Sequence, residues 1–314
     1  MTLRKGKMAE VKEVIIVMAT YNGAFHIKKQ LDSLLAQTYP NLKIVIRDDG
    51  SEDATIKIIK EYQTRTDKIT LLKCDGKNLK CPGSFYEILE QCPKSDYYAF
   101  CDQDDIWYPE KIQWAVEKLN QYGREEPLLY LSSYDYYTEE GKFIRKFPIQ
   151  KEPIRIRNVM YYTPGSGFTL VFNEQLRKKM VVDCKPGNEM HDKWMIRGAI
   201  CFGKIVYDSR STAKHIRYAD SVTAEDAGNT NLLIHFIKDE LLADTAVEAK
   251  EYLKYFYDAF SNEMKPYDKK TMEIFIDDSN NLKSWLRKIF YPHRLRTRIS
   301  GEIALRIMFM IGKI

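Results

Sequence analysis

The sequence lacks any apolar run of the ~18–20 residues that a membrane-spanning helix requires, so a transmembrane protein is not expected. It also lacks the apolar region of a secretory signal, because about five strongly apolar residues follow the basic start, whereas such a region needs roughly 7–15 residues. Internal repeats and low-complexity tracts are absent as well. With 44% hydrophobic and 30% charged residues in a chain of 314, the composition is typical of a folded protein with a sizeable core.

Paired cysteines are also missing, because no CxxC motif occurs among the six cysteines: Cys74, Cys81, Cys92, Cys101, Cys184 and Cys201. This pattern predicts reduced thiols in a cytoplasmic protein. Structural disulfides or a zinc site are the alternatives.

Excess positive charge is scarce outside the C-terminal tail. Residues 281–314 contain eight Lys and Arg and one acidic residue, a net charge of +7. Since the whole chain has a net charge of +5, the part that precedes the tail is slightly negative. The basicity therefore belongs to the tail.

Residues 1–135 alternate between two periodicities. Short apolar runs, rich in β-branched and aromatic residues, predict buried strands at 14–18, 43–47, 69–73, 97–101 and 128–132. Helical spacing occurs between them, as in Ile27, Leu31 and Leu34, and again over 112–119. This alternation predicts a doubly wound α/β domain with a mainly parallel sheet. Farther along, we expect one long helix after Asn231 that extends to Phe260 and another at 269–276.

Polar residues follow three of the predicted strands, in the stretches "ATYNG", "DDGSED" and "DQDD". Ligands of open α/β sheets bind beyond the carboxyl ends of the strands. We therefore expect these three stretches to converge on one binding crevice.

The stretch Asp102-Gln103-Asp104-Asp105 directly follows the apolar run "YYAFC". Carboxylates two residues apart at a strand end can direct oxygen atoms into one cavity, and oxygen ligands suit Mg²⁺ or Mn²⁺. The alternative is that the aspartates cap the next helix, and we expect Asp105 to do so. A similar choice applies to the stretch after the second strand, where Ser51 or Asp53 is a good cap. Asp48 and Asp49 are not needed as caps, because one side-chain oxygen is enough for a helix cap. One of them could instead accept hydrogen bonds from a nucleotide base or ribose.

Five motifs occur in a characteristic order: "MATYNG", "IRDDGSED", "FCDQDDIW", "PGSGFTLVFN" and "MHDKWM". Together they resemble the family 2 glycosyltransferases of the GT-A fold. They are most similar to the rhamnosyltransferase-like branch of bacterial capsule and surface-polysaccharide synthesis. The resemblance implies a GT-A catalytic domain over residues 1–225, Rossmann-like with flanking helices, and a helical extension over 226–314. It extends to the C-terminus and covers nearly the whole chain.

The resemblance implies a nucleotide pocket and a metal site. The nucleotide would contact Thr20, Tyr21, Asn22, Asp48, Asp49 and Asp102. The metal ligands would be Asp104, as the principal one, with Asp102 and His215. Lys77 and Lys80 are expected either to assist the phosphates or to be solvated lysines.

The resemblance also implies a general base and a sugar site. Asp192 matches the base that accepts the acceptor hydroxyl's proton, a task that burial against aromatic walls favours. As an alternative, it could cap a helix that begins at Lys193. The donor sugar or acceptor would contact Trp107, Gly165, Ser166, Gly167, His191 and Trp194.

The basic tail alternates Lys and Arg with aromatic residues and then becomes apolar from Ile303 onward. This pattern favours a peripheral position on the inner face of the cytoplasmic membrane. The alternative is that Ile303, Leu305, Ile307 and Phe309 pack on the domain, and nucleic acid is not expected as a partner.

These observations together predict a metal-dependent, inverting glycosyltransferase. Its donor would be a nucleotide diphosphate sugar carrying UDP or dTDP, with dTDP-rhamnose as the label most common in the branch. Its acceptor would be a lipid-linked or growing surface glycan. A non-catalytic membrane-associated scaffold and a nucleotidyltransferase are the alternative functions, although "ATYNGAFH" lacks the latter's Gly-rich, basic phosphate loop.

Overall fold

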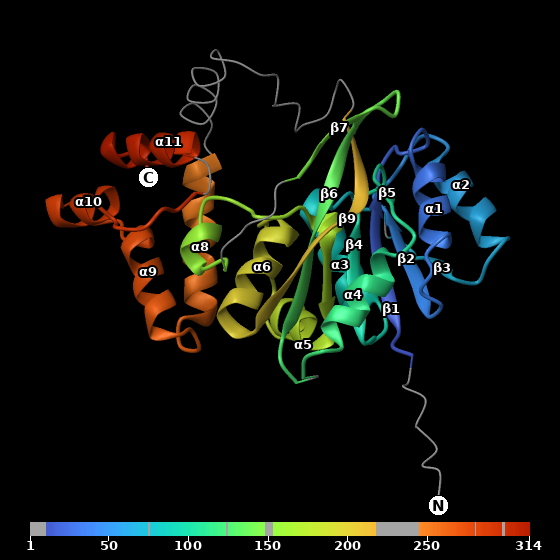
Figure 1. Cartoon of the computed structure of the whole chain (residues 1–314), viewed down its shortest axis with the longest axis horizontal. Coiled ribbons are helices and arrows are strands. Elements are labelled where there is room, and N and C mark those ends of the chain that lie inside the picture. The colour runs from blue at the N-terminus through green and yellow to red at the C-terminus, as the bar shows by residue number, and fades with distance from the viewer. Residues whose placement is uncertain are drawn as a thin grey trace, which may run out of the picture.

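The computed structural model describes residues 11–74, 76–123, 125–147, 153–217, 245–279, 281–296 and 299–314. Its centre is a nine-stranded sheet with the order β3-β2-β1-β4-β8-β6-β9-β5, in which β7 pairs with β6 (Figure 1). The strands are β1 (Val14–Thr20), β2 (Leu42–Asp48), β3 (Ile69–Leu71), β4 (Tyr97–Cys101), β5 (Ile106–Trp107), β6 (Leu128–Thr138), β7 (Phe143–Lys146), β8 (Leu170–Asn173) and β9 (Lys204–Arg217). All five predicted strands are present, four of them within two residues of the predicted bounds, while the fifth, β6, continues six residues beyond the predicted end at Ser132.

Strand direction divides the sheet. β3, β2, β1 and β4 are parallel neighbours, and β8 pairs antiparallel with both β4 and β6. β9 runs parallel to β6, whereas β5 and β7 are antiparallel to their neighbours. Most strands therefore point the same way, and the expected α/β architecture with a mainly parallel sheet is confirmed.

Helices cover both faces of the sheet, which explains why its strands are apolar without alternation. Successive side chains of a strand point to opposite faces. In β1, accordingly, Val14 and Ile16 belong to one apolar core, and Ile15 and Val17 belong to the other. The first core lies under α1 (Ile27–Leu35), α2 (Thr55–Gln63) and α4 (Lys111–Leu119). The second lies under α3 (Lys80–Gln91), α5 (Glu174–Arg177) and α6 (His191–Phe202).

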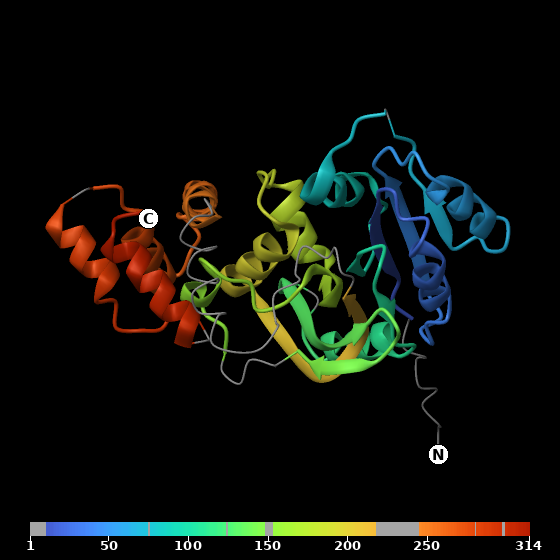
Figure 2. The same ribbon diagram turned by 90° about the horizontal axis from the view of Figure 1, so that it is seen from above.

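A helical extension occupies the end of the molecule opposite α1 and α2 (Figures 1 and 2). It consists of α8 (Thr245–Phe260), α9 (Pro266–Ile276), α10 (Leu282–Ile289) and α11 (Ile299–Met310). The predicted helix at 269–276 is thus confirmed as part of α9. The predicted long helix is described only from Thr245 onward, and both its first part and the expected domain boundary at 225/226 lie outside the described residues. None of the helices described is long and apolar enough to cross a bilayer.

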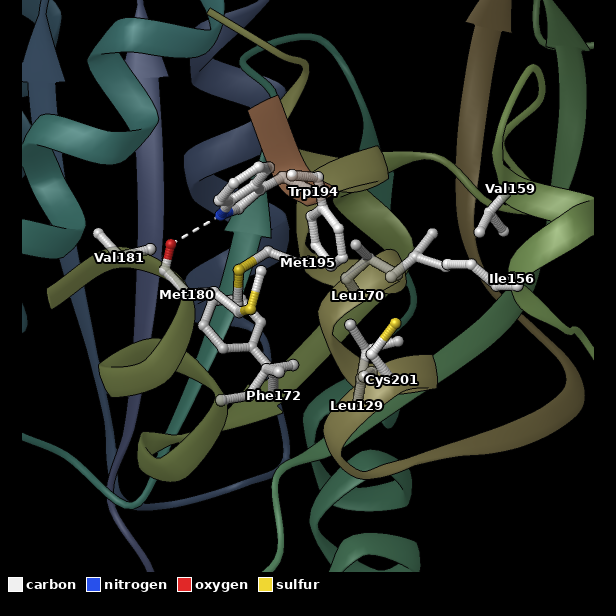
Figure 3. Close-up of a cluster of buried hydrophobic side chains, with 14 of the residues drawn as sticks. Leu129, Ile156, Val159, Leu170, Phe172, Met180, Val181, Trp194, Met195 and Cys201 are labelled. Atoms are coloured by element: carbon white, nitrogen blue, oxygen red, sulfur yellow. Dashed lines mark hydrogen bonds between the residues drawn. The ribbon is translucent and has the colours of Figure 1, made fainter. Parts of the chain in front are cut away.

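The extension shares an apolar core with the sheet. The Trp194 ring of α6 lies 5.2 Å from that of Phe256 and 5.9 Å from that of Phe260 on α8. Figure 3 shows Trp194 in this cluster, where its indole N–H donates to the Met180 carbonyl over 2.7 Å. In α11, Leu305 and Phe309 are buried and belong to the same core, while Ile303 is 51% exposed. Part of the apolar tail therefore packs on the protein.

Candidate active site

The loops that follow β1, β2 and β4 are joined by side-chain hydrogen bonds at the carboxyl edge of the sheet. The Gln103 side chain accepts from the Tyr21 N–H over 2.9 Å and donates to the Tyr21 carbonyl over 3.0 Å. The Asn22 N–H donates to Ser51 Oγ over 2.8 Å. The expected convergence of the three strand ends is therefore present. Gln103 and Ser51 hold it together, roles that a single residue in a loop does not reveal in the sequence.

Asp48 and Asp49 are both buried and hydrogen-bonded within the protein. Asp48 accepts from Thr20 Oγ1 over 2.9 Å and from Ser51 Oγ over 2.6 Å. Asp49 pairs with Arg47 and accepts from the Leu79 N–H over 2.8 Å and the Lys80 N–H over 2.6 Å. Although burial opposes it, these hydrogen bonds hold the pKa of Asp49 below its usual value. Asp48 thus shapes the edge of the sheet, and Asp49 fixes the loop that leads into α3.

Around the end of β4 and the start of α6, three carboxyl groups lie close enough to a fourth, that of Asp102, for their charges to act on it. Burial raises the pKa of Asp102 well above its usual value, and the negative charges of Asp105, Asp104 and Asp192 raise it further. Asp102 and Asp104 come from the loop after β4, and Asp192 lies in the first turn of α6. This concentration of negative charge suits a cation.

Asp105 does not cap the next helix, contrary to expectation. Helix α4 begins only at Lys111 and has no side-chain cap. Asp105 is instead buried, and its Oδ1 lies 2.8 Å from Nδ1 of His215 on β9. Burial lowers the pKa of His215, but the hydrogen bond and charge of Asp105 outweigh this effect and raise it. The pairing of β5 with β9 brings the two residues together, and it anchors His215 beside the carboxyl groups.

Asp192 is buried and is held by a short local contact. Its Oδ1 accepts from the Lys193 N–H over 2.7 Å, inside a helix that begins at His191. Burial raises the pKa of Asp192 to about 6, which suits a group that must accept a proton near neutral pH.

The His191 side chain packs against apolar rings and is neutral. Its ring centroid lies 4.1 Å from that of Phe85 and 4.5 Å from that of Phe100, and burial lowers its pKa to about 3. A Cβ at position 167 would overlap the His191 ring. Gly167 therefore permits close packing against the His191 ring, and a Cβ at position 165 would meet the end of the Leu131 side chain. Ser166 is half-buried between them, and its Oγ donates to the Tyr134 hydroxyl over 3.3 Å.

Both tryptophans expected at the sugar site are core residues. Trp194 is fully buried against α8, and Trp107 is 2% exposed in the core beside α1 and α4. Neither side chain is open to a ligand, so the expectation of sugar contact is wrong for both. The local sequence could not show this, because a tryptophan next to a polar motif suits a sugar platform and a core position equally well.

Lys111 was not predicted, yet it connects several parts of the site. The side chain is fully buried, and its Nζ donates to the Phe168 carbonyl over 2.8 Å and to Thr212 Oγ1 over 3.0 Å. The Phe168 ring is stacked on His215 at 5.5 Å. Lys111 thus ties the loop that contains Ser166 to β9. Its position just before the apolar helical spacing of 112–119 gave no sign of this role.

Asp102 and Asp104 fit a partial metal site. Across the part of the chain that the structure describes, no three His, Cys, Asp or Glu side chains are grouped to hold a metal ion. Mg²⁺ and Mn²⁺ are commonly held by one or two carboxylates together with substrate phosphates. The oxygen donors and the crowded negative charge fit such a site, which the substrate's phosphates would complete.

Comparison with known proteins identifies the class. Residues 15–180, more than half of the chain, match the model for glycosyl transferase family 2. The chain therefore belongs to glycosyl transferase family 2.

The similar curated proteins are matched over part of their length. The chain is 32% identical to an uncharacterized glycosyltransferase of Rickettsia conorii over 46% of this chain and 24% of that protein. It is 38% identical to the dTDP-rhamnosyl transferase RfbG of Shigella flexneri over 32% of this chain and 36% of that protein. The matched segments thus span well under half of these relatives.

Solved structures share the fold over almost the whole chain. Residues 1–349 of S. aureus TarS, in complex with UDP-GlcNAc, align with a TM-score of 0.57 at 15% identity, covering 96% of this chain and 92% of that one. The mannosyltransferase PcManGT of Pyrobaculum calidifontis, in complex with GDP-Man and Mn²⁺, aligns with a TM-score of 0.51 at 14% identity, covering 98% and 89%. The fold is the expected GT-A fold, including its helical continuation.

Proposed function

We propose that this chain transfers a sugar from a nucleotide diphosphate sugar to a hydroxyl group of an acceptor, with inversion at the anomeric carbon. The observation that supports it most strongly is that the negative charges of Asp104 and Asp192 both act on Asp102, next to loops that hydrogen bonds join at the carboxyl edge of the sheet. Asp102 and Asp104 can bind a cation that in turn binds phosphates, and Asp192 can accept a proton. A family 2 chain with both parts has what direct displacement needs.

Asp192 acts as the base in this proposal. Its carboxylate takes the proton of the acceptor hydroxyl as the acceptor oxygen forms a bond to the anomeric carbon. The bond between that carbon and the diphosphate oxygen breaks, and its electron pair leaves with the nucleoside diphosphate. The burial that raises the pKa of Asp192 to about 6 increases its affinity for the transferred proton.

Asp102 and Asp104 would hold Mn²⁺ or Mg²⁺, with His215 beside them. The bound ion would neutralise the negative charge that develops on the leaving diphosphate. The nucleotide would lie over the joined loops after β1 and β2, where Tyr21 is 49% exposed. Thr20 and Asp48 would support this surface through their mutual hydrogen bond. Ser166 would lie near the transferred sugar, and the buried His191 would support this wall through its close contact with Gly167.

The donor and acceptor are proposed from the relatives. A dTDP-sugar, such as dTDP-rhamnose, is favoured by the similarity to RfbG, and a UDP-sugar is the second choice. The acceptor would be a lipid-linked or growing surface glycan, reached at the inner face of the cytoplasmic membrane. The net charge of +7 in residues 281–314 supports a position at an anionic membrane.

The experiment is thermal unfolding with UDP, dTDP, GDP or CMP, each with and without Mn²⁺. A nucleotide at a hundred times its dissociation constant should stabilise the protein by about 2.7 kcal/mol. We expect one nucleotide to do so only with Mn²⁺, in wild type and in Asp258→Ala, a matched substitution at an exposed aspartate on α8. Asp104→Ala should lose the effect. If no nucleotide stabilises the wild type with Mn²⁺, the proposed site is wrong.

A further inference from the structure

Helix α10 turns polar side chains toward the protein and apolar side chains outward, which is the reverse of the usual arrangement in a folded domain. Its buried residues are Ser284 and Lys288, and Nζ of Lys288 donates to the Asp277 carbonyl over 2.9 Å. Its apolar residues point outward: Leu282 is 70% exposed, and Phe290, which follows the helix, is 73% exposed. Polar side chains thus hold the helix against the protein, while its apolar side chains remain exposed.

A groove of about 1020 Å³ runs between α9 and α10. Ile274 and Tyr291 line it together with the outward apolar residues of α10, including Leu286. An open, apolar groove beside an exposed apolar helix face offers room for a hydrocarbon chain.

The charge around the groove has one sign. Lys270, Lys283 and Arg287 line it, and no carboxylate does. Lys283 and Arg287 are exposed and form no ion pair within the described part of the chain. The two acidic residues that precede α10 are engaged elsewhere: Asp278 pairs with Lys250 at 2.9 Å, and Asp277 accepts from the Ser279 N–H over 2.8 Å. The surface is therefore complementary to an anionic group.

Arg306 of α11 fixes the shape of this surface. Its guanidinium donates to four carbonyl groups that follow or end α10, at 2.7–3.1 Å, those of Lys288, Ile289, Tyr291 and His293. Glu302 in turn accepts from Arg306 Nε over 2.8 Å. The backbone that presents Phe290 and Tyr291 is thus held in place, so the exposed Phe290 belongs to a built surface.

We propose that α10 and the α9–α10 groove bind the interface of an anionic membrane, with a lipid hydrocarbon chain in the groove and a phosphate group against Lys283 and Arg287. A helix in a membrane interface uses its apolar face for burial and its basic flank for anionic head groups. The inference deepens the proposed membrane position by naming the surface that makes the contact. It assigns this contact to α10, whereas the sequence pointed to the apolar residues of α11, and it does not depend on sugar transfer.

The first test is flotation of the full chain with phosphatidylglycerol vesicles and with phosphatidylcholine vesicles. Wild type should bind the anionic vesicles at least tenfold more strongly. Leu282→Ser combined with Phe290→Ser should reduce that binding at least tenfold, and Lys283→Gln combined with Arg287→Gln should remove the preference for anionic lipid. Phe143→Ser, at an aromatic residue on β7 that is 52% exposed, is the matched control and should bind as wild type does.

The second test uses Trp285 as a probe, because it is 39% exposed on α10. Brominated phosphatidylglycerol should quench the tryptophan fluorescence of wild type, and Trp285→Phe should bind the vesicles equally well but lose this quenching. Equal binding to both lipids, no binding, or quenching that persists in Trp285→Phe would overturn the proposal. So would a dimer that forms through α10 while vesicles stay unbound. Stabilisation by nucleotide with Mn²⁺, measured on the same variants, should remain, which separates failure of this surface from failure of the active site.

Discussion

Helices α1 and α10 bury opposite kinds of side chain. In α1 the apolar residues Ile27, Leu31 and Leu34 are fully buried against the sheet. In α10 the buried residues are Ser284 and Lys288, and the apolar residues face outward. In the sheet region, burial of apolar side chains thus stabilises the fold of the chain itself. In part of the extension, apolar side chains stay exposed and can be buried only by a partner. The same contrast separates the two proposed tasks, chemistry in the sheet region and attachment in the extension.

Substitution of the proposed base should have the largest effect, because it should lower the transfer rate of the sheet region without changing membrane binding by the extension. Asp192→Asn keeps the size of the side chain but cannot accept a proton, so we expect the transfer rate to fall by roughly 10²–10⁴-fold. Nucleotide binding and vesicle binding should stay within about twofold of wild type, since neither uses this carboxylate. The measurement is single-turnover transfer, with Asp258→Asn on α8 as the control. Full activity in Asp192→Asn would refute the role of the base.

Matched leucine truncations should sharpen the contrast between the helices. Leu31→Ala removes a fully buried side chain and should reduce the free energy of unfolding by about 2–5 kcal/mol. Leu286→Ala makes the same chemical change at a residue that is 38% exposed, and it should alter stability by no more than about 0.5 kcal/mol. Urea unfolding measures both. Similar losses for the two variants would mean that α10 buries its apolar face within this chain.

The smallest expected effect is a pH dependence confined to the sheet region. Asp192 has a pKa raised to about 6 and is active when ionised, so transfer should be nearly constant above that pH and fall about tenfold for each unit below it. The measurement is kcat/KM from pH 5 to pH 8. Vesicle binding, which involves neither Asp192 nor the other carboxyl groups of the active site, should change little. A transfer rate that rises on acidification would contradict the assignment.

The sequence predicted the parallel half of the sheet best, because strands buried on both faces show as continuous apolar runs. It did not predict that β8 inserts antiparallel between β4 and β6, since pairing between strands so distant along the chain leaves no local signal. The convergence of the loops after β1, β2 and β4 followed from the polar stretches at the ends of three predicted strands. The roles of Trp107 and Trp194 did not, because burial depends on what packs over a residue. Helix α10 was also beyond prediction: its basic and aromatic composition was evident, but which face is outward depends on the packing of α9 and α11.

The contact between Trp194 and α8 has a consequence for protein engineering. Trp194 follows Asp192 by two residues in α6, and its ring packs on Phe256 and Phe260. Helix α8 thus braces the helix that carries the proposed base. A chimaera that exchanges membrane-binding tails between relatives should keep α8 with the sheet region and be joined after Phe260, so that attachment can be exchanged while the geometry at Asp192 is inherited unchanged.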